Sequence, residues 1–162
     1  MNPLILNLKE TTKYKSILES ITSNKPSSIT VTGLTDSVKA SQIYAITKDL
    51  SKSSIVVCSN VASATRLIQD LKFFSDIEIV FLPSKNIEYY DIDAESKEIE
   101  NARMYAIDKV KSGKLNIVVT TIDAFLIKMF SNKTYDNLSI NISCNSVINL
   151  TRFTEKLVSL RI

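Results

Sequence analysis

Residues 29–40 read ITVTGLTDSVKA, a β-branched run that is followed by a glycine and the start of a helical pattern. A strand that turns at a glycine into a helix is the setting of the phosphate-binding loop G-x-x-x-x-G-K-[ST]. Gly33 and Lys39 keep this pattern, whereas Val38 replaces the second glycine and Ala40 replaces the Ser/Thr. The stretch predicts an α/β fold in which a nucleotide site has lost its working parts.

Each departure from the pattern weakens phosphate binding for its own reason. Val38 is β-branched and disfavours the positive φ that converging backbone N–H groups need. Asp36 places a carboxylate beside the phosphate position, and Ala40 lacks the hydroxyl that would hold Mg²⁺. Two interpretations stay open: a degenerate phosphate loop of Gly33, Asp36, Val38, Lys39 and Ala40 that binds no cofactor, or an ordinary strand-to-helix turn.

Composition limits the classes of protein that the chain can belong to. Its 162 residues suffice for one domain or slightly more, and 44% hydrophobic residues can form a core. The chain has no histidine, and Cys58 and Cys144 lie far apart, so we predict neither a metal site nor histidine catalysis. The apolar runs are too short to span a membrane and no signal-peptide pattern is present, which indicates a cytoplasmic protein.

The net charge of +3 is distributed unevenly along the sequence. Acidic residues concentrate between Glu88 and Glu100, where they would repel phosphate. They also suit a solvated loop that leads into a helix N-terminus, and we favour this interpretation. The basic residues form no stripe interleaved with aromatic residues, which is the pattern typical of a nucleic-acid-binding module.

Strand and helix patterns alternate along the chain. Hydrophobic periodicity predicts strands at residues 28–32, 54–59, 77–82 and 116–120, and helices at residues 8–22, 37–50, 61–74, 95–111 and 121–130. This alternation predicts βαβ units and a RecA-like, P-loop-type parallel sheet flanked by helices. The continuous apolar runs at 55–57 and 117–119 predict strands that helices cover on both faces.

The pattern changes near residue 133. Residues 138–143 alternate between apolar and polar types, which predicts a half-exposed strand, and an amphipathic helix follows Thr151. One strand and one helix cannot close a core of their own. We therefore divide the chain into an N-terminal helix (1–24), a degenerate RecA-like lobe (25–132) and the incomplete start of a second small α/β domain (133–162).

Five stretches of the sequence follow one another in the order known from one protein family. They are VTGLTDSVKASQI (a relic of a phosphate loop), IVVCSNVASATRLIQDLKFF, FLPSKNIEYYDIDAESKEI, IENARMYAI with Arg103, and NIVVTTIDAFLIKM. The third is similar to a Pro-x-x-Glu-x-x-Pro-Tyr-Asp segment, in which Pro83, Tyr90 and Asp91 match and Tyr89 replaces a usual proline. Together, over residues 25–160, they resemble the N-terminal, UvrB-like module of the bacterial transcription-repair coupling factors (Mfd).

The resemblance implies a RecA-like helicase lobe that has lost ATPase function and is interrupted by a small domain that recruits UvrA. The whole protein of that family binds stalled RNA polymerase, translocates on DNA and connects transcription to nucleotide excision repair. For this chain it implies a non-catalytic scaffold that contacts the other domains of its parent. UvrA would be reached through the mostly missing second domain, and RNA polymerase and DNA through domains further downstream.

Two segments that follow predicted strands carry further candidate residues. Tyr89–Asp91, together with Arg103, form a possible interaction loop; the plainer interpretation is that one tyrosine packs under the loop and the other is exposed. Thr121 follows the strand at 116–120 and is predicted to cap the next helix, with Asp123 in its first turn.

Three functions are therefore compatible with the sequence. The first is the non-catalytic scaffold, the second a nucleotide-binding enzyme domain with a divergent phosphate loop that uses Lys39, and the third a stand-alone, flavodoxin-like partner-binding domain. No acidic Walker-B box follows any predicted strand, which weighs against the enzyme. Only the family resemblance separates the first function from the third.

Overall fold

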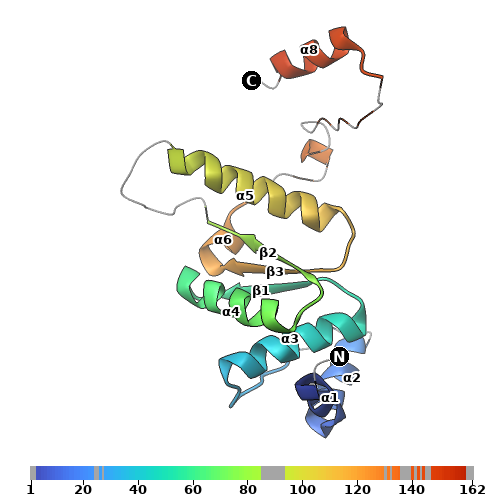
Figure 1. The fold of residues 1–162 in the computed structure, drawn as a ribbon, viewed down its shortest axis with the longest axis vertical. Coiled ribbons are helices and arrows are strands. Elements are labelled where there is room, and N and C mark those ends of the chain that lie inside the picture. Colours follow the sequence, from blue (N-terminus) through green and yellow to red (C-terminus); the bar gives the residue numbers. More distant parts are fainter. Residues whose placement is uncertain are drawn as a thin grey trace. The chain divides into compact units, whose positions relative to one another are not determined.

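A computed structural model describes residues 3–23, 26, 28–84, 94–129, 131, 133–135, 140, 142, 144 and 147–159. The chain divides into two compact units, residues 1–127 and residues 128–162. The first unit is an α/β structure with a small parallel sheet flanked by helices, as Figure 1 shows. The predicted fold class is thereby confirmed at this level.

The sheet has three strands, β1 (Ser54–Cys58), β2 (Glu78–Leu82) and β3 (Asn116–Thr121). Their order is β1-β3-β2, and both pairings are parallel. Val119 of the central strand lies opposite Val56 of β1 and Phe81 of β2. Three of the four strands predicted for the first lobe are confirmed.

Helices cover the two faces of the sheet unequally. Helix α4 (Val61–Phe74) contacts all three strands, whereas α5 (Ala94–Lys111) packs mainly on β2 and β3. Helix α4 connects β1 to β2 across the position of β3, and α5 connects β2 to β3 in the opposite direction along the sheet. Because both crossovers are right-handed, the two helices lie on opposite faces of the sheet. Ile117 belongs to the core cluster on the α4 side, and Val118 packs with Ala106 on the α5 side.

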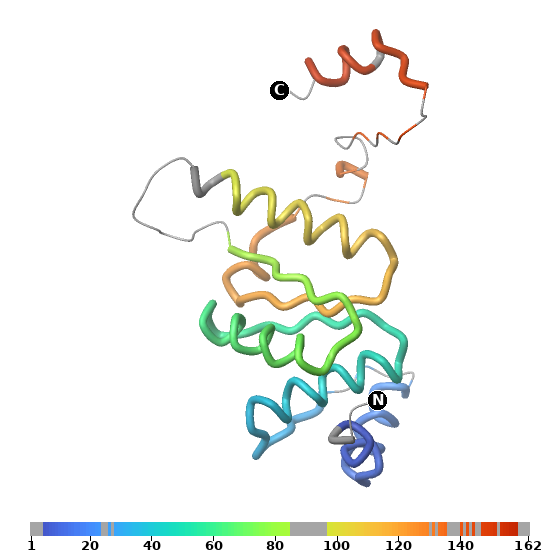
Figure 2. The backbone as a smooth tube through the Cα atoms, viewed as in Figure 1, coloured from blue at the N-terminus to red at the C-terminus, as the bar shows by residue number. Residues whose placement is uncertain are grey.

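The N-terminal helices form an outer layer on α4. Helix α3 (Asp36–Leu50) packs on α4, and α1 (Pro3–Glu10) packs on α3 and on α2 (Thr12–Thr22), as the tube in Figure 2 lets the reader follow. The single helix predicted at 8–22 is wrong, because Thr11 separates two helices. Its side chain accepts a hydrogen bond from the backbone N–H of Tyr14 and so caps α2.

The strand predicted at 28–32 is also wrong. These residues lie outside the sheet, and all five are exposed. Thr30 and its neighbours line a shallow pocket together with residues of α2, among them Thr12 and Ile17. A β-branched sequence favours a strand only where a neighbouring strand and a buried face are available, and here the segment has neither.

The prediction that helices cover β1 on both faces is wrong as well. Val56 and Cys58 pack against the core on the α4 side. Ile55 and Val57 point to the other face, where they are 62% and 42% exposed. The reason is topological, since α5 packs mainly on β2 and β3.

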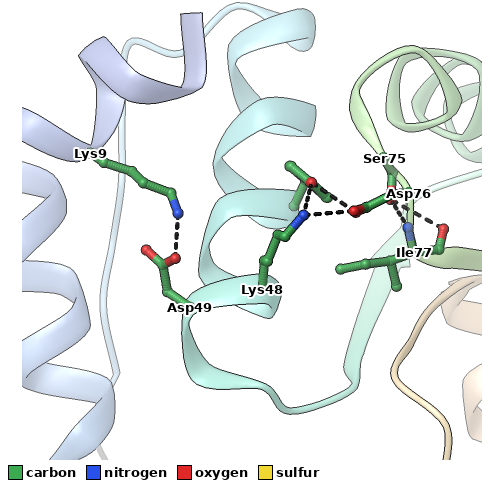
Figure 3. Close-up of polar contacts among 7 residues, drawn as sticks. Lys9, Lys48, Asp49, Ser75, Asp76 and Ile77 are labelled. Carbon is green, nitrogen blue, oxygen red and sulfur yellow. Dashed lines mark hydrogen bonds and ion pairs between the residues drawn. The ribbon is translucent and has the colours of Figure 1, made fainter. Parts of the chain in front are cut away.

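Polar contacts connect the outer helices to the rest of the first unit. The Tyr14 hydroxyl donates to Asp49 Oδ2 of α3 at 2.8 Å, and Lys9 of α1 forms an ion pair with the same carboxylate. Lys48 of α3 donates to Asp76 Oδ2 at 2.7 Å, just before β2. Figure 3 shows both lysines directed at their carboxylates. The Lys48 contact raises the pKa of the lysine and lowers that of Asp76.

The second unit contains the amphipathic helix α8 (Leu150–Ser159), which confirms the helix predicted after Thr151. Leu150 and Val158 are exposed, whereas Phe153 and Leu157 are half-buried. The strand predicted at 138–143 falls almost entirely outside the described residues. Among the helices that the structure describes, none combines the length and apolar character needed to cross a membrane.

Candidate functional site

A pocket of about 260 Å³ lies where β1 ends and the helices α3 and α4 begin. Ligands of open α/β sheets bind outside the carboxyl ends of the strands, so this position is the expected one for a site. The lining side chains come from three elements and their connections: Asp36 and Lys39 of α3, Cys58 and Ser59 at the end of β1, and Ser63, Arg66 and Leu67 of α4.

The residues of the degenerate phosphate loop surround the first turn of α3. Gly33 has φ +78°, a left-handed conformation that suits glycine. Lys39 Nζ donates to Asp36 Oδ1 of its own helix at 2.9 Å, and this hydrogen bond lowers the pKa of Asp36. Val38 is 38% exposed, whereas Ala40 is fully buried in the core shared by α3 and α4. Position 40 therefore contributes packing and does not face the pocket.

The α4 wall of the pocket was not predicted from the sequence. Ser63 and Arg66 are separated by three residues on α4, so the helix brings them to one side, and Ser59 precedes the helix. This spacing was a readable signal, but an exposed polar stripe is common on helices. Asn60 caps α4, because its side-chain oxygen accepts from the Ser63 backbone N–H at 2.8 Å.

Cys58 closes the pocket at the end of β1. Its side chain is half-buried, and burial raises the pKa of its thiol. A thiol with a raised pKa stays protonated at neutral pH and is a poor nucleophile. Cys58 therefore contributes a small apolar surface to the pocket rather than a reactive group.

The possible interaction loop is only partly described. Tyr89–Asp91 lie outside the described residues, and the role of this segment stays a prediction. Arg103 is only 5% exposed, and its guanidinium donates to the backbone carbonyl oxygen of Pro83. Burial lowers the pKa of Arg103. The side chain thus anchors α5 to the chain just after β2.

The carboxyl end of β3 is built as the sequence predicts. The Thr121 hydroxyl accepts from the Ala124 backbone N–H and caps α6 (Ile122–Leu126), with Asp123 in the first turn. The helix is shorter than the predicted span 121–130, and Ile127 follows it in an extended conformation. The Thr120 hydroxyl donates to the Leu82 carbonyl oxygen at 2.9 Å, a buried contact between β3 and β2.

Exposed apolar side chains mark β1 and α6, which contact each other. On α6, Phe125 is 52% exposed and Leu126 is 74% exposed. With Ile55 and Val57 of β1, these two residues constitute what we call the β1–α6 apolar surface. Exposed apolar side chains on two elements that contact each other make a candidate interaction surface.

The comparisons with known proteins add no relative to this picture. No protein-family model, no curated protein and no solved structure matches the chain. Within the described part of the chain, no three His, Cys, Asp or Glu side chains gather as they would around a metal ion. Sequence resemblance and the geometry above are therefore the grounds on which a function can be proposed.

Proposed function

We propose that this chain is a non-catalytic interaction module, the degenerate RecA-like N-terminal lobe of a transcription-repair coupling factor. Such a factor is a DNA-repair protein that links stalled RNA polymerase to nucleotide excision repair. The observation that carries the interaction role is the β1–α6 apolar surface. The family assignment is supported by the order of the five sequence stretches.

Burial of the β1–α6 apolar surface would stabilise a complex. Transfer of one Val, Leu, Ile or Phe side chain from water to an apolar contact contributes roughly 1.5–3 kcal/mol. Ile55, Val57, Phe125 and Leu126 are each at least 42% exposed, so a large part of that free energy is still available. In this proposal the surface packs against other domains of the parent, which carry the contacts with UvrA, RNA polymerase and DNA.

The non-catalytic character is supported by the first turn of α3. Lys39 is engaged by Asp36, and Ala40 offers no hydroxyl to a magnesium ion. A millimolar nucleotide site has only about 4 kcal/mol of binding free energy, and each missing charge-assisted hydrogen bond removes roughly 1.5–3 kcal/mol. Two such losses leave no measurable affinity for ATP.

The alternative, a nucleotide-binding enzyme domain, is favoured by one observation, namely that Lys39 and Arg66 line the same pocket. The pocket of about 260 Å³ is, however, smaller than the roughly 300–1,000 Å³ of typical small-molecule sites. Calorimetry with Mg-ATP, combined with a phosphate-release assay, separates the two functions. We expect no saturable binding; micromolar affinity that disappears in Lys39→Ala would establish the enzyme.

The repair role can be tested in the organism that encodes the chain. We expect that disruption of the gene abolishes the faster repair of ultraviolet lesions in the transcribed strand, measured by strand-specific lesion mapping. Val57→Asp should have the same effect while the circular dichroism spectrum stays unchanged. Val110→Asp is the matched control, because Val110 is a valine of similar exposure (50%) on α5, a helix outside the β1–α6 apolar surface. Undiminished strand bias after gene disruption would refute the family assignment.

A further inference from the structure

Four polar side chains of the pocket converge from opposite walls. Lys39 comes from the first turn of α3, Ser59 from the connection between β1 and α4, and Ser63 and Arg66 from α4. No ion pair of Arg66 occurs among those that the structure describes, whereas Lys39 has Asp36 as its partner. Arg66 nevertheless lies close enough to Asp36 for its charge to lower the pKa of that carboxyl, so both cations of the pocket face the same carboxylate.

The charges of the pocket favour an anion. Lys39 and Arg66 supply two positive charges, and Asp36 supplies one negative charge. The first turn of α4 adds the partial positive charge of a helix N-terminus. The Ser59 hydroxyl accepts from the Asn60 side chain at 3.4 Å and keeps its own proton for another acceptor. Two cations with hydroxyl donors between them are chemically suited to several oxygens of one small group.

From this arrangement we infer that the pocket binds a tetrahedral oxyanion, either inorganic phosphate or the phosphate group of a small monoester, between Arg66 and Lys39. Arg66 donates two N–H groups to neighbouring oxygens, because the planar guanidinium fits such pairs. The Ser59 and Ser63 hydroxyls donate to the oxygens nearer to α4. The volume of about 260 Å³ suits a small anion better than a whole nucleotide. The inference concerns the pocket alone and does not depend on the repair function proposed above.

Asp36 gives this inference a distinctive consequence. Its carboxylate holds Lys39 at 2.9 Å, and it lines the same pocket. A bound phosphate therefore competes with Asp36 for the lysine and is repelled by the carboxylate. Removing the negative charge should tighten binding, whereas removing the guanidinium should weaken it.

The experiment is a titration of the folded chain with sodium phosphate at pH 7 and constant ionic strength, followed by backbone amide chemical shifts. We expect saturable shifts confined to the first turns of α3 and α4, with a Kd in the millimolar range. Arg66→Gln should raise the Kd at least tenfold, and Asp36→Asn should lower it several-fold. Lys72→Gln removes one exposed positive charge from the same helix outside the pocket, so its Kd should stay within about twofold of the unmodified value.

Three results would overturn the inference. The first is the absence of saturation up to 50 mM phosphate, on the order of the weakest site that this titration resolves. The second is an equal response to sodium chloride, which indicates charge screening rather than a site. The third is an equal effect of Lys72→Gln and Arg66→Gln. None of these results bears on strand-specific repair, so the failure of this inference is distinguishable from a failure of the proposed function.

Discussion

Strands β1 and β3 lie side by side with similar sequences, SIVVC and NIVVTT, and yet their environments differ. Every residue of β3 is buried. In β1 the side chains alternate between half-buried and exposed, and its two exposed ones are Ile55 and Val57. The difference arises from position in the sheet, because β3 is central and lies between α4 and α5, whereas β1 is an edge strand and α5 packs mainly on the other two strands.

This contrast explains why a continuous apolar run is an ambiguous signal. Such a run is expected where helices cover both faces of a strand. It is equally expected where helices cover one face of the strand and the other face binds a separate domain or protein. In this protein β3 fulfils the first expectation, and β1 leads to the proposal of an interaction surface. Substitutions in the two strands, and in residues that contact the sheet, test this difference in burial.

The largest effect should come from removing the same side chain in each strand. Ile117 of β3 is fully buried, whereas Ile55 of β1 is 62% exposed. We expect Ile117→Ala to lower the free energy of unfolding by about 3 kcal/mol, because it removes buried methyl groups and leaves a cavity. Ile55→Ala should lower it by less than about 1 kcal/mol. Urea unfolding followed by circular dichroism measures both changes.

An equally large loss from Ile55→Ala would contradict the picture of an open β1 face. It would show that a second copy of the chain, or another part of it, covers this face in solution. Repeating the measurement at several protein concentrations distinguishes these two cases, since only self-association makes the unfolding midpoint depend on concentration.

A smaller effect should come from the buried cation on the covered side of the sheet. Arg103→Met keeps an unbranched side chain but removes the donor to the Pro83 carbonyl oxygen. Leaving a buried acceptor without its partner costs about 1–3 kcal/mol, and we expect a loss in the lower half of this range. Lys97→Met on the exposed side of α5 is the control and should change stability by less than about 0.5 kcal/mol. Equal stability of the two variants would show that the Arg103 contact does not form in solution.

The pH dependence of stability distinguishes the two edge strands. Glu78 of β2 accepts from Lys109 of α5 at 2.7 Å and from the Tyr105 hydroxyl at 2.9 Å, whereas none of the described ion pairs involves β1. The Lys109 hydrogen bond is the main cause that lowers the pKa of Glu78 below its ordinary value of 4.5. The folded state therefore binds the proton less readily than the unfolded state does.

The sign of the effect follows from this difference. The stabilising contribution of Glu78 is fully present above pH 4.5 and is lost as the pH falls through the lower, folded-state pKa. In Glu78→Gln the fall in the urea midpoint between pH 5 and pH 2.5 should be shallower than in the unmodified chain. Glu98→Gln on the exposed part of α5 is the control and should leave the slope unchanged. If the urea midpoint of Glu78→Gln falls as steeply with pH as that of the unmodified chain, the Glu78–Lys109 ion pair does not stabilise the folded state.

Local patterns in the sequence predicted most of the elements. The stripe of Ala64, Leu67, Ile68 and Leu71 identified α4 with its correct bounds, since helix periodicity is a property of the segment itself. The Thr121 cap was predictable for the same reason, because an N-cap requires only a hydroxyl and the following backbone N–H groups.

The errors concern features that depend on residues far away in the sequence. Residues 28–32 have a strand-like composition, but whether they join the sheet depends on a pairing partner that the segment cannot specify. The exposure of Val57 depends on which strands α5 packs against. In the pocket, Lys39 was predictable from its motif, whereas Arg66 enters it only because α3 packs beside α4.

The smallest change in stability is expected from a substitution in the connection between α3 and β1. Ser51 ends α3 with φ +50°, and it is the one described residue other than glycine with a positive φ. A left-handed conformation costs a residue with a Cβ about 1–2 kcal/mol, and glycine avoids this cost. The greater freedom of glycine in the unfolded chain offsets about 0.4–1 kcal/mol of the benefit. We therefore expect Ser51→Gly to stabilise the protein by about 0.5 kcal/mol and to raise its Tm by roughly 2 °C.

Ser51→Ala is the control, because it keeps the Cβ and its Tm should therefore not rise. Calorimetry of the unmodified chain and the two variants compares the three Tm values directly. A lower Tm for Ser51→Gly would mean that Ser51 leaves the left-handed region in solution, and the entry of the chain into β1 would then differ from the one described.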